Sequence, residues 1–241
     1  DITTFPTTPS TITSATYVLD IPFIPVGATD FFKQGVAIDG DYIIIGNYED
    51  DTDGTNSGKA YIYDITTFPT SPSTITSTTY VLDNPNAYGT SASDYFGYSV
   101  AIDGNTAIVG AYGEGDASGE FNSGKAYVYD ITTFPASPAT ITSATYVLDH
   151  PNKWGAYGSG PGTSENMYFG AKVTIDNNNI VVGADGDILH TEDGGNTYTA
   201  YTTTAIAAAV TAPKFTGVAY SGGNVVFAFV DNIAVPTDAG L

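Results

Sequence analysis

Short apolar segments separated by polar turns run along the whole chain, and no stretch shows convincing helical periodicity. Val100–Ile102 is predicted as a strand whose residues face alternately outward and inward, and the Asp103–Asn105 step that follows is a tight-hairpin signal. The apolar run Thr106–Val109 is typical of a strand covered on both faces. After an acidic, glycine-rich loop, Lys125–Tyr129 alternates again, and Thr145–Leu148 forms an outer strand. The pattern predicts four short strands in each unit.

The pattern recurs because the chain is an internal repeat. Asp1–Asp20 returns almost unchanged as Asp64–Asp83 and Asp130–Asp149, a period of about 65 residues. Each copy carries an Ile-Thr-Thr-Phe-Pro stretch, which we expect in a loop or at a sheet edge because proline cannot donate a full ladder of hydrogen bonds. A second shared phrase lies between these copies and begins at Phe31, at Tyr95 and, in a diverged form, at Tyr168.

Four strands in each repeat of this length predict an all-β fold, a β-propeller of about four four-stranded blades. A solenoid is the alternative, but its units are usually shorter. We expect a single repeat domain over residues 1–241. Its parts are a partial blade at 1–20, blades at 21–83 and 84–149, a diverged blade at 150–204 and a partial blade at 205–241.

The two partial blades are complementary. The chain begins with the late part of one unit and ends with the early part of another, so Phe215–Val230 is expected to pair with Thr16–Asp20. Pairing within one chain would close the ring, whereas pairing between chains would link subunits head to tail by strand addition.

The second unit resembles the FG-GAP repeat, the blade of integrin α-chain propellers. Phe96, Gly97 and Gly110, followed by the segment 124–129, carry this resemblance. The first unit matches less well, since Lys33 stands where the motif has glycine. The resemblance implies a propeller blade and a recognition role outside the cell, and it implies no particular ligand.

A further motif lies near the C-terminus. The stretch from Thr191 to Tyr198 resembles the Asp-box, a hairpin turn of sialidase-like propellers, through Asp193, Gly195 and Tyr198. In that family the motif holds a turn on the outer blade edge, away from the active site. It therefore implies propeller geometry and no catalytic role.

Charge excludes several partners. The formal net charge is −20, charged residues make up only 13% of the chain, and every basic residue is a lysine. Phosphate backbones and anionic lipids would repel such a chain, so we expect neither nucleic-acid binding nor membrane insertion. With no cysteine and a threonine- and glycine-rich composition, we expect an extracellular, cell-surface or virion-surface location. Because the chain opens at Asp1 without a methionine, we also expect a processed product or an excised part of something longer.

The residues needed for common enzyme chemistry are missing or scattered. A sialidase-like site would need arginines, and the two histidines, His150 and His190, have no metal-binding spacing. The glutamates fall in loop-like contexts. We therefore expect no enzyme activity and no required cofactor.

A calcium ion is the one cofactor that the acidic loops suggest. The loop between the first two strands, where FG-GAP relatives carry a Ca²⁺ motif, is too short here. One loop later the acidic residues have the spacing of oxygen ligands for a hard cation, and the candidate ligands are Asp50, Asp51, Asp53 and Asp116. The alternative is a solvated acidic loop.

Aromatic residues in glycine-rich loops are the candidate binding residues: Trp154, Tyr157 and Tyr88. Exposed rings of this kind suit sugar stacking or protein contact, although Trp154 could instead pack over a blade edge. The predicted partners are a glycan or protein on a surface, or copies of the chain itself. The first functional hypothesis is thus a non-catalytic adhesion or recognition module. The second is an architectural subunit assembling through strand exchange, and the third is a secreted carbohydrate-active enzyme.

Overall fold

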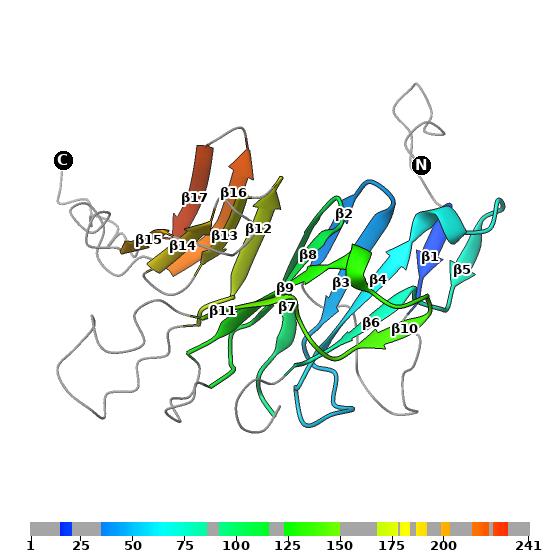
Figure 1. Cartoon of the computed structure of the whole chain (residues 1–241), viewed down its shortest axis with the longest axis horizontal. Coiled ribbons are helices and arrows are strands. Elements are labelled where there is room, and N and C mark those ends of the chain that lie inside the picture. The colour runs from blue at the N-terminus through cyan, green and yellow to red at the C-terminus, as the bar shows by residue number, and fades with distance from the viewer. Residues whose placement is uncertain are drawn as a thin grey trace, which may run out of the picture.

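The computed structural model describes residues 15–20, 35–85, 92–115, 123–149, 168–177 and 179–183, and the backbone alone of 187–191, 199–202, 214–221 and 224–230. Within these ranges the chain is all-β, as predicted, apart from two short 3-10 turns. The strands form successive propeller-like blades, which stand side by side along the molecule (Figure 1).

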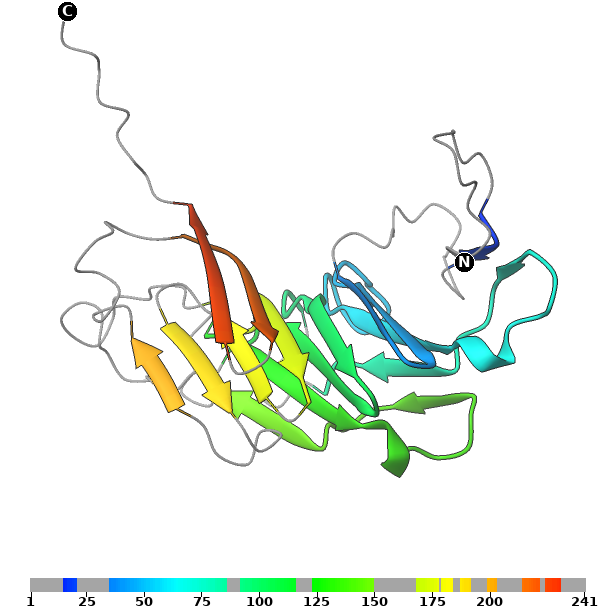
Figure 2. The same ribbon diagram turned by 90° about the horizontal axis from the view of Figure 1, so that it is seen from above.

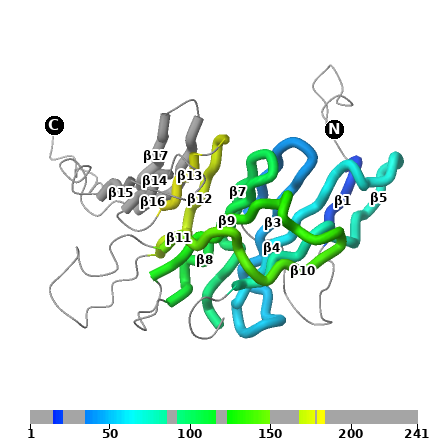
Figure 3. The backbone as a smooth tube through the Cα atoms, viewed as in Figure 1, coloured from blue at the N-terminus to red at the C-terminus, as the bar shows by residue number. Residues whose placement is uncertain are grey.

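Each of the first two blades contains an antiparallel meander. The first blade consists of β2 (Val36–Asp39), β3 (Tyr42–Asn47), β4 (Lys59–Asp64) and β6 (Tyr80–Asp83). The second consists of β7 (Phe96–Asp103), β8 (Thr106–Ala111), β9 (Lys125–Asp130) and β11 (Tyr146–Asp149). The predicted hairpins are confirmed, since Asp39 faces Tyr42 and Asp103 faces Thr106 across the turns. Figure 3 shows the matching course of the backbone in these two blades.

A third blade and a final hairpin follow. The third blade consists of β12 (Lys172–Asp176), β13 (Asn179–Gly183), β14 (Asp187–Thr191) and β15 (Thr199–Thr202). The hairpin pairs β16 (Lys214–Ser221) with β17 (Asn224–Val230). Because β16 lies against β12 and β13, it takes the place of an inner strand after the third blade (Figure 2).

The proline-bearing stretch forms an edge strand, and it joins the sheet before its own. After 3-10 turns η2 (Ile65–Thr67) and η3 (Ile131–Thr133), the chain enters β5 (Ser73–Ile75) and β10 (Ala139–Ile141). β10 pairs in parallel with β6 of the preceding blade, and β5 pairs in the same way with β1 (Tyr17–Leu19). Phenylalanines from the same stretches pack on these sheets, Phe68 against Tyr17 at 5.3 Å and Phe134 against Tyr80 at 5.0 Å between ring centroids.

The hydrophobic core lies between the blades. Ile44, Ile62 and Leu82 of the first blade form one buried cluster with Val100 and Ile102 of the second. No single sheet therefore has a complete core of its own, and neighbouring blades stabilise each other.

Glycines allow this close approach. A β-carbon on Gly46 would stand 1.9 Å from the carbonyl oxygen of Gly97, and one on Gly110 would stand 1.9 Å from that of Gly170. Since no such contact is tolerated, the seams between the blades require glycine at these positions.

Carboxylates at the hairpin tips join the same blades. The Oδ2 atom of Asp39 accepts a hydrogen bond from the backbone N–H of Gly104 at 2.8 Å. Asp103 accepts one from the backbone N–H of Asn177 in the third blade. The hairpin aspartate thus orients the next blade as well as closing its own turn.

The expected pairing of Phe215–Val230 with Thr16–Asp20 does not occur among the described strands. β1 pairs with β5 and β16 pairs with β17, and the two pairs lie at opposite ends of the molecule (Figures 1 and 2). The physical reason is distance, because three blades stand between the two pairs of strands.

Candidate binding surface

The acidic loop after β3 is folded around a buried carboxylate. Asp50 is 4% exposed, and its Oδ2 atom accepts a hydrogen bond from the Tyr61 hydroxyl at 3.0 Å. Its Oδ1 atom accepts from the backbone N–H of Thr52 at 3.0 Å and also from the Thr52 hydroxyl. Burial, followed by the nearby Asp50 charge, raises the pKa of Tyr61 well above its ordinary value, so this hydroxyl remains a donor.

The second repeat builds the same turn with a longer acid. Glu114 is fully buried and accepts from the Tyr127 hydroxyl. The backbone matches as well, since Gly58 N–H donates to the Asp50 carbonyl at 3.0 Å and Gly124 N–H to the Glu114 carbonyl at 2.9 Å. Sequence comparison missed this recurrence because the acid changes from aspartate to glutamate. The shared geometry makes these carboxylates part of the turn architecture.

The other predicted calcium ligands of this loop also face protein donors. Asp51 accepts from the backbone N–H of Asn56 at 2.7 Å, and Asp53 pairs with Lys59 at 2.5 Å. Burial alone would lower the pKa of Lys59, but its hydrogen bonds to Asp53 and Asp83 outweigh this effect and raise it. Among the described residues, no three acidic or histidine side chains gather as a metal site. Asp116 lies outside those residues, so calcium binding stays a prediction.

Two further charged groups are buried between the blades. Lys125 is fully buried and pairs with Asp149 at 2.5 Å. Asp94 is 3% exposed and accepts a hydrogen bond from the Asn84 amide at 2.8 Å. Burial raises the pKa of Asp94 to about 6, although the Asn84 hydrogen bond and the Lys125 charge act to lower it.

Five half-buried tyrosines meet at one end of the inner strands, and we call them the tyrosine cluster: Tyr48, Tyr95, Tyr98, Tyr112 and Tyr168. Tyr112 lies at its centre. Its ring stacks on Tyr95 at 4.9 Å with only 5° between the planes, and it meets Tyr98 edge-on at 4.4 Å. The neighbouring blades supply Tyr48, 5.2 Å from Tyr98, and Tyr168, 5.5 Å from Tyr112.

The cluster is held in place by unusual backbone geometry. Tyr95 and Tyr168 both adopt left-handed conformations, with φ of 54° and 49°. Such a conformation is unfavourable for a bulky residue, and here it recurs at the residue that precedes each buried phenylalanine of the seams. Burial, followed by the other tyrosines, raises the pKa of Tyr112 well above its ordinary value, so its hydroxyl remains protonated.

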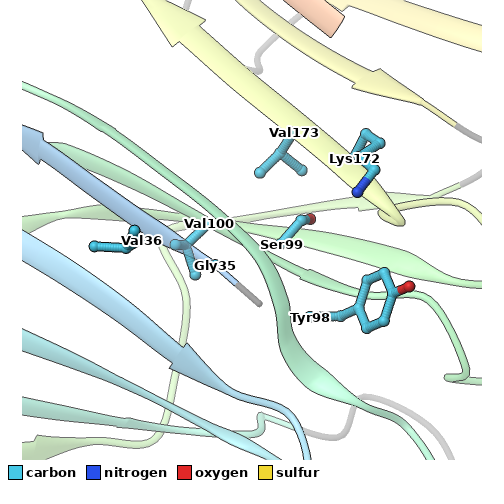
Figure 4. Close-up of a pocket in the computed structure, with 7 residues that line it drawn as sticks. All are labelled: Gly35, Val36, Tyr98, Ser99, Val100, Lys172 and Val173. Atoms are coloured by element: carbon cyan, nitrogen blue, oxygen red, sulfur yellow. The ribbon is translucent and has the colours of Figure 1, made fainter. Parts of the chain in front are cut away.

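A shallow groove of about 180 Å³ runs beside the cluster, between the inner strands of three successive blades. Figure 4 shows Lys172 and Val173 on one side, Tyr98 and Ser99 in the middle and Val36 on the other side. The Lys172 amine lies 5.8 Å from the centre of the Tyr98 ring, a cation–π distance. The groove thus combines the Tyr98 ring, the Ser99 side chain and the positive charge of Lys172.

Phenylalanine and glycine at the start of each inner strand connect this surface to the blade seams. Phe96 and Phe169 are buried and bridge in parallel to Gly58 and Gly124 of the preceding blades. Gly97, with φ of 89°, follows Phe96 at the seam. The FG-GAP repeat model matches residues 26–63 and 86–129, which include this motif.

These two units are FG-GAP repeats. The FG-GAP geometry explains the predicted motif residues Phe96, Gly97 and Gly110, all of which lie at seams between blades. The crystal structure of the computationally designed Ika4 protein is similar in fold, with a TM-score of 0.51 and 12% identity over 90% of this chain and 93% of that chain. No curated protein sequence matches the chain. In the described part of the molecule, no helix is long and apolar enough to cross a membrane.

The structure does not test the binding residues predicted from the sequence. Trp154, Tyr157 and Tyr88 fall outside the described residues, as do Asp193, Gly195 and Tyr198 of the Asp-box-like motif. The tyrosine cluster was missed, although a signal for it exists. Tyr48 and Tyr112 occupy one repeat position after the second strand, and Tyr95 and Tyr168 occupy another before Phe-Gly.

Proposed function

We propose that the chain is a non-catalytic recognition module and that its tyrosine cluster binds a glycan presented on a surface outside the cell. The observation that carries the proposal is the meeting of five half-exposed rings from three blades at one face. Tyrosine rings offer an apolar face to the C–H groups of a sugar and a hydroxyl to its polar edge. FG-GAP repeats are generally non-enzymatic and typical of extracellular proteins, in keeping with this role.

The surroundings of the cluster favour a neutral or weakly anionic sugar over a polyanion. The net charge of −20 repels extended phosphate or sulfate chains, whereas Lys172 provides one local positive charge beside the rings. The groove beside the cluster is small and open along the inner strands, so it suits one or two sugar units.

Glycan-array screening followed by titration calorimetry tests the proposal. Replacing Tyr112 by alanine removes the central ring, and we expect affinity for the best array ligand to fall at least about tenfold. Tyr112→Phe retains the ring faces, so its loss of affinity should be smaller than that of Tyr112→Ala. Tyr146, which is 39% exposed on the outer strand β11, provides the matched control as Tyr146→Ala.

If Tyr112→Ala and Tyr146→Ala lowered the glycan affinity equally, with unchanged melting temperatures, the assignment of the binding site to the tyrosine cluster would be contradicted. Loss of binding with Trp154→Ala alone would place the ligand on the loop that the sequence singled out. If the folded chain bound no glycan on the array, the proposal that its ligand is a glycan would be contradicted.

An architectural role is the second candidate. It is favoured by the incomplete sheets at both ends of the described molecule, where β1–β5 and β16–β17 each contain only two strands.

A further inference from the structure

An apolar face is exposed on β2, the inner strand of the first blade. Val36 is 69% exposed and Ile38 is 64% exposed. The second repeat has the same Val-Ala-Ile-Asp sequence in β7, yet there Val100 is 9% exposed and Ile102 is 6% exposed. Identical residues at equivalent positions thus have opposite environments.

The preceding blade accounts for this difference. Val100 and Ile102 are buried because β7 packs against the first blade, where Ile44 and Ile62 belong to the same core cluster. β12 packs on the second blade through the same arrangement. Among the described strands, no blade stands before β2 to cover it in this way.

The opposite end of the molecule offers the missing element. The hairpin β16–β17 follows the third blade as an inner pair of strands, and it forms a sheet of two strands only. At the first end, β1 has the Tyr-Val-Leu-Asp sequence of β6 and β11, which are the fourth strands of their blades. Among the described strands, one end therefore carries inner strands without outer ones, and the other carries an outer strand without inner ones.

We propose that a second copy of the chain covers Val36 and Ile38 with the blade that begins with its β16–β17 hairpin. The contact would continue the blade-to-blade packing that already joins the first three blades. The contact is heterologous, because it joins two different surfaces. It therefore links copies head to tail, and each assembly keeps one free β2 face and one free β16–β17 hairpin to which further copies can bind. A contact within one chain is disfavoured by position, because β2 and β16–β17 lie on different ends of the row of blades (Figures 1 and 2).

The charge of the chain predicts how this assembly responds to salt. Copies with a net charge of −20 repel each other, whereas the proposed contact is apolar on the β2 side. Added salt screens the repulsion and leaves apolar burial intact. Assembly should therefore increase as sodium chloride is raised from low concentration.

Sedimentation velocity of the full chain over a range of concentrations tests the proposal. The wild-type chain should form species larger than a monomer, and the double variant Val36→Asp, Ile38→Asp should weaken their association by about 100-fold or more, since it removes two apolar side chains from the contact. Val147→Asp is the matched control, because Val147 is 46% exposed on β11, away from the proposed contact. Unchanged melting temperatures in the variants, together with unchanged glycan binding in the single variant Ile38→Asp, separate this proposal from the recognition role, because Val36 also lines the groove beside the tyrosine cluster.

Cross-linking tests the same contact without introducing charges. The chain has no cysteine, so Val36→Cys in one sample and either Val225→Cys or Val226→Cys in another provide single thiols. Since successive strand residues point to opposite faces, one of the two β17 positions should join Val36 through a short bis-maleimide in the mixed sample only. A monomer at every concentration and salt level, assembly insensitive to the double variant, or the absence of any mixed product would overturn the proposal.

Discussion

Replacing Gly110 by alanine tests the seam between the second and third blades. Gly110 lies in β8, and a β-carbon there would stand 1.9 Å from the Gly170 carbonyl oxygen and 2.5 Å from the Ser99 hydroxyl. The Ser99 side chain can rotate, but the carbonyl belongs to the backbone of the next blade. The blades must therefore move apart to accept the methyl group.

The cost of that movement can be estimated from the contacts at the seam. Overpacking a well-packed core costs about 1–3 kcal/mol. Parting the blades also weakens the 2.7 Å hydrogen bond from Ser99 to the Gly170 carbonyl, which contributes about 1 kcal/mol. We expect Gly110→Ala to lower the free energy of unfolding by about 2–4 kcal/mol, or the melting temperature by about 10 °C.

Gly104→Ala is the matched control. Gly104 lies at the hairpin tip with φ of 54°, and a β-carbon there would meet no other atom within 4 Å. Alanine there incurs only the left-handed backbone penalty of about 1–2 kcal/mol. Both substitutions reduce the freedom of the unfolded chain equally, so that effect cancels in the comparison. Urea unfolding followed by circular dichroism measures both, and a Gly110→Ala loss no larger than that of Gly104→Ala would refute the seam argument.

Two buried charges give the remaining predictions. Asp94, with its pKa raised to about 6, retains a proton in the folded chain between about pH 4 and pH 6 that the unfolded chain releases, so stability should fall as pH rises through this window. Asp94→Asn should remove up to about 3 kcal/mol of this pH dependence in urea titrations, and a wild-type profile that rises with pH there would contradict it. Lys125→Met removes the 2.5 Å ion pair with Asp149 and should lower the free energy of unfolding by about 2–3 kcal/mol. This value is below that for a fully buried pair, because Asp149 is partly exposed. Adding Asp149→Leu should recover part of that loss, and a double variant no more stable than Lys125→Met would indicate that the pair is not the cause.

The repeat and the strand periodicity were enough to predict the class of fold. The hairpin at Asp103–Asn105 and the central strand at Thr106–Val109 follow from local rules, because turn chemistry and a two-sided apolar run act over a few residues. The FG-GAP motif was also recognisable in the second unit, where Phe96 is buried and a β-carbon on Gly97 would stand 2.3 Å from the Lys59 carbonyl oxygen.

Contacts between repeats could not be predicted from rules that act over a few neighbouring residues. Nothing in the composition of Ser73–Ile75 or Ala139–Ile141 indicates that each strand joins the sheet before its own, because parallel pairing depends on where the preceding blade stands. The tyrosine cluster escaped notice for the same reason. Tyr48, Tyr98 and Tyr168 come from three blades, and their proximity is a property of the stacking of the blades.

Packing between blades also explains why β2 differs from its counterpart β7. The first two blades support each other in two ways: the first blade covers the inner face of the second, and β10 from the second repeat adds a strand to the outer edge of the first. Among the described strands, no complete blade stands before β2 to cover its face. The exposed Val36 and Ile38 on β2 are the direct consequence, since the same residues one repeat later are buried. The proposed contact would give β2 the cover that β7 already has, because the β16–β17 hairpin continues the same blade-to-blade packing that buries Val100 and Ile102.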